Sequence, residues 1–223
     1  MMSKRFYRSI AAALVLIAVG LTGCGVPGQG EKQADTCFIY TDGLLDDLCA
    51  IEYLGGRYDK AVVLLQDPDG LADSPYGSRA VTDESALFNV ISNWFDSVAP
   101  YSDSTDISKA DLYLLAPLTA FSALLKADPS LRSRRALLMA GDSEGPDGAG
   151  GDWNAIMDPE AYRYVTENMT DLIQMTRPVC ESEYETNAYP FDAQFLAEYT
   201  AQMASMDENL CCYDLQAVAL YFK

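Results

Sequence analysis

Three aspartates lie within six residues in the segment TDGLLDD, which spans residues 41–47. An apolar run precedes this segment and another follows it, so the pattern places the aspartates between a strand and a helix. Acidic side chains favour helix caps and first helical turns, which would account for Asp46 or Asp47. Asp42 is not explained in this way, because carboxylates held close together raise one another's pKa unless a cation lies between them. Oxygen ligands of this kind bind Ca²⁺ or Mg²⁺, so the segment predicts a metal site, with helix capping as the alternative.

The chain from residue 37 onward alternates short apolar runs with longer amphipathic segments. Strands are predicted at residues 37–41, 61–65, 112–116, 136–140 and 172–176. Helices are predicted at residues 46–54, 78–98 (with Trp94 and Phe95 in the core), 118–127, from 158 onward, 191–206 and 214–222. This alternation predicts an α/β fold with a mostly parallel, Rossmann-like open sheet and helices on both faces. Ligands bind such folds at the carboxyl ends of the strands, so the loops that follow the strands should build any site.

Three later segments also combine polar side chains with a strand end or a helix start. They read LAPLT at residues 115–119, GDWNAIMDPEA at residues 151–161 and YDLQAVA at residues 213–219. Together with FIYTDGLLDDLCAI at residues 38–51, they resemble the motifs of the inosine-uridine-preferring nucleoside hydrolases and occur in the order of that family. The resemblance extends over residues 37–223 and implies a nucleoside hydrolase-like fold.

The resemblance implies roles for individual side chains. The calcium ligands of the family correspond to Asp42, Asp47, Asp214 and the backbone carbonyl of Thr119. The residues that contact the substrate, mainly its ribose, correspond to Asp46, Asp67, Met139, Asp152 and Asn154. Asp42 would also act as the general base, and Tyr213 stands where the family commonly has a histidine that protonates the departing base.

These roles imply a calcium-dependent N-ribohydrolase, a hydrolase of purine or pyrimidine salvage that cleaves the N-glycosidic bond of nucleosides or related ribosides. In the family, Ca²⁺ holds the ribose hydroxyls and a water, and this water attacks the anomeric carbon once an aspartate takes its proton. Tyr213 replaces the histidine, Asp67 replaces an asparagine and Asp152 replaces a glutamate. The chain is also short for the family after Asp214. A catalytically impaired module that binds ribose or nucleosides is therefore the alternative.

The first residues have the layout of a signal peptide. A short basic region precedes an apolar run at residues 10–21, which is shorter than the roughly 20 residues that a membrane-spanning helix needs. The sequence LTGC then resembles a bacterial lipobox, which is cleaved before its lipidated cysteine, here Cys24; an uncleaved anchor is the alternative. We expect a lipoprotein signal peptide at residues 1–23, the lipidated cysteine and a flexible tether at residues 24–36, and one extracytoplasmic, membrane-anchored domain at residues 37–223.

The composition excludes several classes of function. The chain has 33 acidic and 15 basic residues, a formal net charge of −18 and no histidine. It therefore lacks a Ser-His-Asp triad, an HExxH zinc site and the basic surface that binds nucleic acid. The cysteine spacing indicates neither a zinc site nor a disulfide framework, and Cys37 and Cys49 are expected in the core. The expected partners are a small-molecule nucleoside or riboside and the membrane, and the sequence leaves a homo-oligomer open.

Overall fold

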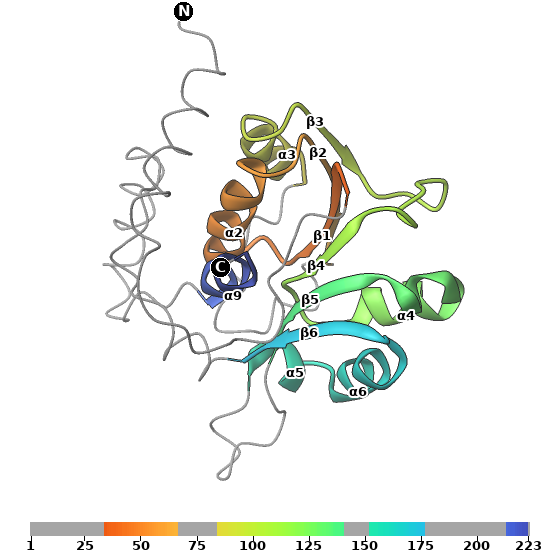
Figure 1. Cartoon of the computed structure of the whole chain (residues 1–223). Helices are drawn as coiled ribbons and strands as arrows, with labels where there is room; N and C mark the ends of the chain where they lie inside the picture. The colour runs from red at the N-terminus through yellow and green to blue at the C-terminus, as the bar shows by residue number, and fades with distance from the viewer. Residues whose placement is uncertain (1–33, 67–83, 141–151, 177–212, 223) are drawn as a thin grey trace, which may run out of the picture.

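The computed structural model describes residues 34–66, 84–140, 152–176 and 213–222, which form one twisted sheet and the helices that cover it (Figure 1). The strands are β1 (Thr36–Thr41), β2 (Lys60–Leu65), β3 (Ser97–Pro100), β4 (Asp111–Leu114), β5 (Arg135–Met139) and β6 (Asp171–Met175). The helices are α2 (Leu45–Gly55), α3 (Glu84–Ile91), α4 (Thr119–Ala127), the 3₁₀ helix η3 (Pro129–Ser133), α5 (Trp153–Ile156), α6 (Pro159–Asn168) and α9 (Tyr213–Tyr221). Among these described residues, no helix has the length and apolar character needed to cross a membrane.

The six strands are parallel and lie in the order β3-β2-β1-β4-β5-β6. From β1 the chain adds β2 and then β3 on one side of the sheet. It then returns to the other side of β1, where it adds β4, β5 and β6. The neighbours β1 and β4 mark the point where the strand order reverses, and parallel sheets bind ligands in the crevice at this point. The parallel, Rossmann-like α/β arrangement predicted from the sequence is confirmed.

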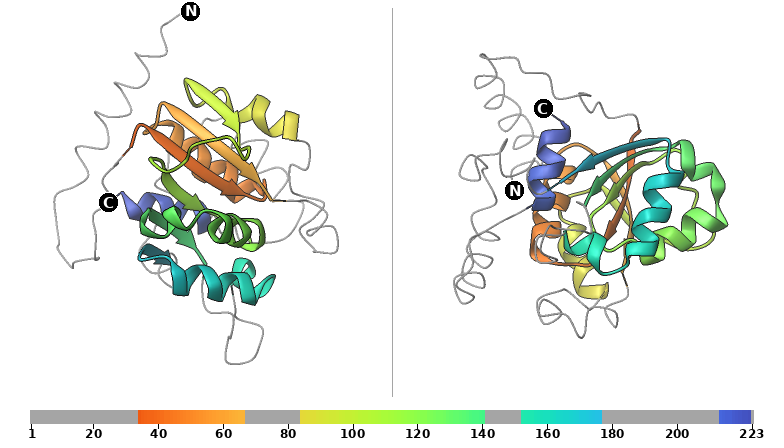
Figure 2. Two further views of the ribbon diagram at one scale, coloured as in Figure 1. Left: turned by 90° about the vertical axis from the view of Figure 1, so that its right-hand side faces the viewer. Right: turned by 90° about the horizontal axis from the view of Figure 1, so that it is seen from below.

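Two hydrophobic layers sandwich the sheet, one on each face. Successive side chains of a strand point to opposite faces, so Cys37 and Ile39 of β1 pack under α2, α3 and α9, whereas Phe38 and Tyr40 pack against α4 and α6. Figure 2 shows α9 beside α2 on one side of the sheet, with α4 and α6 on the other side. The predicted burial of Cys37 and Cys49 is confirmed.

The helix predicted at residues 78–98 is confirmed over residues 84–91 and is wrong from residue 92 onward. Helix α3 ends at Ile91, and Ser97–Pro100 forms the edge strand β3. The side chains of Ser92 and Asn93 bond back to the carbonyl of Asn89, which offers the backbone an alternative to continued helix. Trp94 and Phe95 pack against the core as predicted, but from a turn and not from a helix.

The remaining predicted helices mostly match the structure. The segments predicted at 46–54, 118–127 and 214–222 correspond to α2, α4 and α9, and Asp158 caps α6 by accepting a hydrogen bond from the amide of Ala161 at 2.9 Å. The short helices η3 and α5 were not predicted, because each contains only one turn. Residues 78–83 and the helix predicted at 191–206 lie outside the described residues.

Replacing Gly55 by alanine should destabilise the fold by about 1–3 kcal/mol, because a new methyl group there would overpack the core. A Cβ at Gly55 would lie 2.6 Å from the Cβ of Trp94 and 2.7 Å from its carbonyl oxygen. The neighbouring Gly56→Ala is the matched control, since its Cβ would meet nothing closer than the Tyr53 carbonyl oxygen at 3.4 Å. Urea unfolding of both variants measures the difference, and equal stability would contradict this packing.

Candidate metal centre

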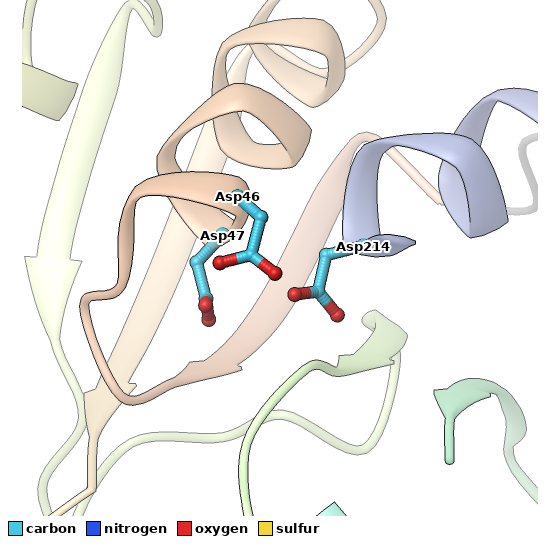
Figure 3. A group of neighbouring side chains, drawn as sticks. All are labelled: Asp46, Asp47 and Asp214. Atoms are coloured by element: carbon cyan, nitrogen blue, oxygen red, sulfur yellow. The ribbon is translucent and has the colours of Figure 1, made fainter. Parts of the chain in front are cut away.

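Three aspartates converge at the carboxyl end of the sheet. Asp46 and Asp47 lie in the first turn of α2, and Asp214 lies in the first turn of α9. Their carboxylate oxygens lie within 4.8 Å of one another and turn toward the same space (Figure 3). Asp47 and Asp214 are buried, and Asp46 is half-buried. Packing of α2 against α9 thus brings together acids that are more than 160 residues apart in the sequence.

The turn between β1 and α2 fixes how Asp42 and Asp47 lie. Gly43 has a φ of 73°, a left-handed conformation that glycine adopts at little cost. Its amide donates to Thr41 Oγ1 at 3.0 Å, and the amide of Leu44 donates to Asp42 Oδ1 at 3.2 Å. The Thr41 hydroxyl in turn donates to Asp47 Oδ1 at 2.5 Å. One threonine therefore supports the glycine turn and orients a carboxylate of the triad.

Burial raises the pKa of every acid in this cluster, and repulsion by neighbouring aspartates raises the pKa of Asp42, Asp47 and Asp214 further. Burial, followed by the charge of Asp46, raises the pKa of Asp42 to about 7. Burial and the neighbouring aspartates hold the pKa of Asp47 and of Asp214 well above the usual range. Asp46 and Asp214 are close enough to share a hydrogen bond, which two carboxyl groups can form only if one is protonated. Without a cation, the cluster must therefore retain protons.

The donor set of the triad fits a hard metal ion. All its donors are carboxylate oxygens, which Ca²⁺ and Mg²⁺ prefer. Oδ1 of Asp214 is buried and has no hydrogen-bond partner among the described residues. A buried oxygen of this kind costs free energy unless a partner satisfies it. Within the described part of the chain, Asp46, Asp47 and Asp214 are the acidic group that could hold a metal ion.

The other predicted metal ligands differ in how they lie relative to the triad. Asp42 is buried and lies near the triad, where its charge helps to raise the pKa of Asp47 and of Asp214. Thr119 is exposed at the start of α4, where its hydroxyl donates to Asp158 Oδ2 at 2.7 Å. Its carbonyl oxygen accepts from Ser122 Oγ at 2.9 Å. Neither contact joins Thr119 to the triad, so its role as a ligand stays a prediction.

Asn154, one of the predicted substrate contacts, connects the ends of β4 and β5. The side-chain amide of Asn154 donates to the carbonyls of Leu115 at 2.9 Å and Met139 at 3.0 Å. Asp152 caps α5 by accepting from the amide of Asn154 at 2.9 Å. Asp152 and Asn154 are both buried, and the Met139 side chain packs in the core beneath α2 and α9. The structure therefore places all three residues at this edge of the sheet.

Tyr213, the predicted proton donor, is the first residue of α9 and precedes Asp214. It is half-buried and packs against the core on the α2 side of the sheet. The predicted ribose contact Asp67 and the predicted lipidation site Cys24 lie outside the described residues.

Three polar residues at this edge were missed by the sequence reasoning. Thr41 orients Asp47, Tyr40 contacts the loop before α4, and Gln66 follows β2 with its amide donating to the Thr41 carbonyl at 2.7 Å. Their position directly at the ends of two predicted strands was the available signal. Their partners are mostly backbone carbonyls and amides, which residue types do not reveal.

No protein-family model matches the chain, and the search of curated proteins found no match. The likeness to nucleoside hydrolases therefore rests on the motifs in the sequence.

Without metal, the free energy of unfolding should fall as the pH rises from about 4 to about 7. The pKa of Asp42 is about 7 in the folded protein, whereas an aspartate in an unfolded chain has a pKa near 4. Between these values the folded state binds more protons than the unfolded chain, and stability then decreases with pH. We expect a loss of about 3 kcal/mol in urea unfolding with a chelator present, and a smaller loss for Asp42→Asn. Flat profiles for both proteins would contradict this prediction.

Replacing Asp214 by asparagine should have opposite effects with and without metal. At about pH 8 in chelator, the variant should be more stable by about 1–3 kcal/mol, because a neutral amide can be buried there without taking up a proton or a cation. Its melting temperature should no longer rise with calcium, because a ligand oxygen is lost. Asp103→Asn, an exposed change of the same charge, is the control. Thermal unfolding tests both effects, and an unchanged calcium response in Asp214→Asn would exclude Asp214 as a ligand.

Proposed function

We propose that the chain is a calcium-dependent N-ribohydrolase that cleaves the N-glycosidic bond of nucleosides or related ribosides. The observation that carries the proposal is the acidic triad, assembled by the starts of α2 and α9. It lies at the strand end of β1, next to the point where the strand order reverses. The motifs that resemble nucleoside hydrolases contain these same aspartates.

Calcium suits this cluster better than zinc does. Ca²⁺ takes six to eight oxygen ligands in flexible geometry, and carboxylates supply several of them. Zinc favours sulfur and nitrogen ligands, whereas the triad offers only carboxylate oxygens. Asp47 and Asp214, with Asp42 beside them, would hold the ion, which would supply positive charge and orient the vicinal hydroxyls of a ribose.

Asp42 is suited to take a proton from an attacking water. Its pKa of about 7 in the absence of metal reflects burial and the charge of Asp46, and a bound cation would lower it. A carboxylate that is ionised at neutral pH and held by the turn at Gly43 can act as a general base. The remaining aspartates would stabilise the positive charge that develops on the sugar ring in the transition state.

Asn154 would contact the sugar through its oxygen. An asparagine amide has two N–H donors, and those of Asn154 point to the carbonyls of Leu115 and Met139. The Oδ1 atom is therefore the group that it can offer to a ribose hydroxyl. Asp46 and Asp152 would add acceptors on either side.

A riboside-binding module without turnover is the second candidate function. Tyr213 stands where a histidine commonly donates the proton to the departing base, and a phenol with its ordinary pKa near 10 gives up a proton less readily. The acids that bind calcium are retained, whereas the leaving-group side is altered. We further propose that Cys24 carries a lipid that anchors the domain outside the cytoplasm.

Activity should appear as calcium-dependent release of ribose from inosine, uridine or p-nitrophenyl riboside. Asp42→Asn should reduce the rate about 10²- to 10⁴-fold, the range for removal of a general base. Asp103→Asn should keep the full rate, because its side chain is exposed and is not one of the acids of the cluster. A reducing-sugar assay with the purified protein measures these rates.

Three outcomes of this experiment differ in meaning. Turnover that disappears in Asp42→Asn supports the hydrolase. Binding of calcium and ribose without turnover, measured by calorimetry, supports the binding module. A melting temperature that does not respond to calcium counts against both, because a ligand that binds the native state must stabilise it.

A further inference from the structure

Tyr40 lies at the carboxyl end of β1, two residues before Asp42, and is fully buried. Its ring packs on the α4 face of the sheet, with its centroid 6.2 Å from that of Phe121. The ring therefore belongs to the core opposite α2, but its hydroxyl reaches the loops at the edge of the sheet.

The hydroxyl of Tyr40 connects three segments of the chain. It donates to the carbonyl of Pro117 at 2.6 Å and accepts from the amide of Ala120 at 3.3 Å. It also contacts the side-chain amide of Gln66, directly after β2. A phenol has one proton, so all three contacts are satisfied when the Gln66 amide presents its NH₂ group to the tyrosine oxygen.

Gln66 extends this network to the metal triad. Its backbone amide donates to the Thr41 carbonyl at 2.7 Å, and the Thr41 hydroxyl donates to Asp47 Oδ1 at 2.5 Å. A continuous set of contacts thus connects the loop before α4, through Tyr40 and Gln66, with a carboxylate of the triad. The ring fixes the hydroxyl in place because it is buried on the far face of the sheet.

We propose that Tyr40 is a positioning residue for the metal centre, which holds the ends of β1 and β2 and the loop before α4 in the arrangement that binds calcium. The proposal rests on the proposed function only in the choice of calcium. Loss of the hydroxyl would leave the core packing of the ring unchanged and free the three segments to move relative to Asp47. Calcium affinity should therefore fall, although Tyr40 itself touches no metal.

The test is the dissociation constant for calcium, measured by calorimetry on purified full-length protein. Tyr40→Phe should raise this constant about tenfold, which corresponds to about 1.4 kcal/mol. Tyr113→Phe is the matched control. Tyr113 is another fully buried tyrosine of the sheet, and its hydroxyl bonds to that of Tyr58 at 2.7 Å. The control should lose stability in urea but keep its calcium affinity.

Gln66→Met gives a second measurement if Tyr40→Phe does not fold. It removes the amide that contacts Tyr40 while keeping the length of the side chain, and it should weaken calcium binding in the same direction. Equal calcium affinity in the unaltered protein, Tyr40→Phe and Gln66→Met would overturn the positioning role while leaving the proposed function intact. An equal loss in Tyr113→Phe would show a general structural effect and also overturn it. Absence of calcium binding in the unaltered protein would overturn both proposals.

Discussion

Repulsion among buried carboxylates is the constraint on which the carboxyl edge of the sheet depends. Asp46, Asp47 and Asp214 lie together because α2 and α9 pack side by side on the same face. The hydrophobic packing of these two helices therefore has to offset the repulsion between the carboxylates in their first turns. Such an arrangement is stable only if bound protons or a bound cation reduce the negative charge of the three carboxylates.

At the opposite edge of the sheet, the chain itself supplies hydrogen-bond donors to a buried acid. Asp111 is buried at the start of β4, and its Oδ2 accepts from the hydroxyl of Tyr58 at 2.8 Å and from the amide of Ala34 at 3.2 Å. Helix α9 extends between the two edges, with Asp214 in its first turn and Tyr221 at its end, 6.0 Å from the ring of Tyr113. Two donors thus contact Oδ2 of the carboxylate at one edge, whereas carboxylates lie against one another at the other. This contrast favours a ligand-binding role for the triad.

Hydrophobic pattern predicted most of the sheet, because buried parallel strands are short apolar runs. It failed at residues 92–100, where a strand of four residues on the edge of the sheet has too few apolar positions to differ from the end of a helix. Within the candidate site, the acids of the β1–α2 turn were evident from their spacing. The position of Asp214 beside these acids depends on tertiary packing, so only the resemblance to nucleoside hydrolases predicted it. The bonds of Asn154 and Tyr40 to main-chain carbonyls leave no trace in residue types.

The departures from the nucleoside hydrolase motifs affect the two sides of the scissile bond differently. In the proposed hydrolase, Asp42, Asp47 and Asp214 would act on the sugar side of the scissile bond, whereas Tyr213 would act on the departing base. A purine or pyrimidine leaves more readily when it is protonated, but p-nitrophenolate is a stable anion and needs no proton donor. If the acid cluster is functional and only the donor is impaired, p-nitrophenyl riboside should be cleaved much faster than inosine. Equal rates would indicate that Tyr213 or another group still protonates the base, and loss of both reactions would place the defect on the sugar side.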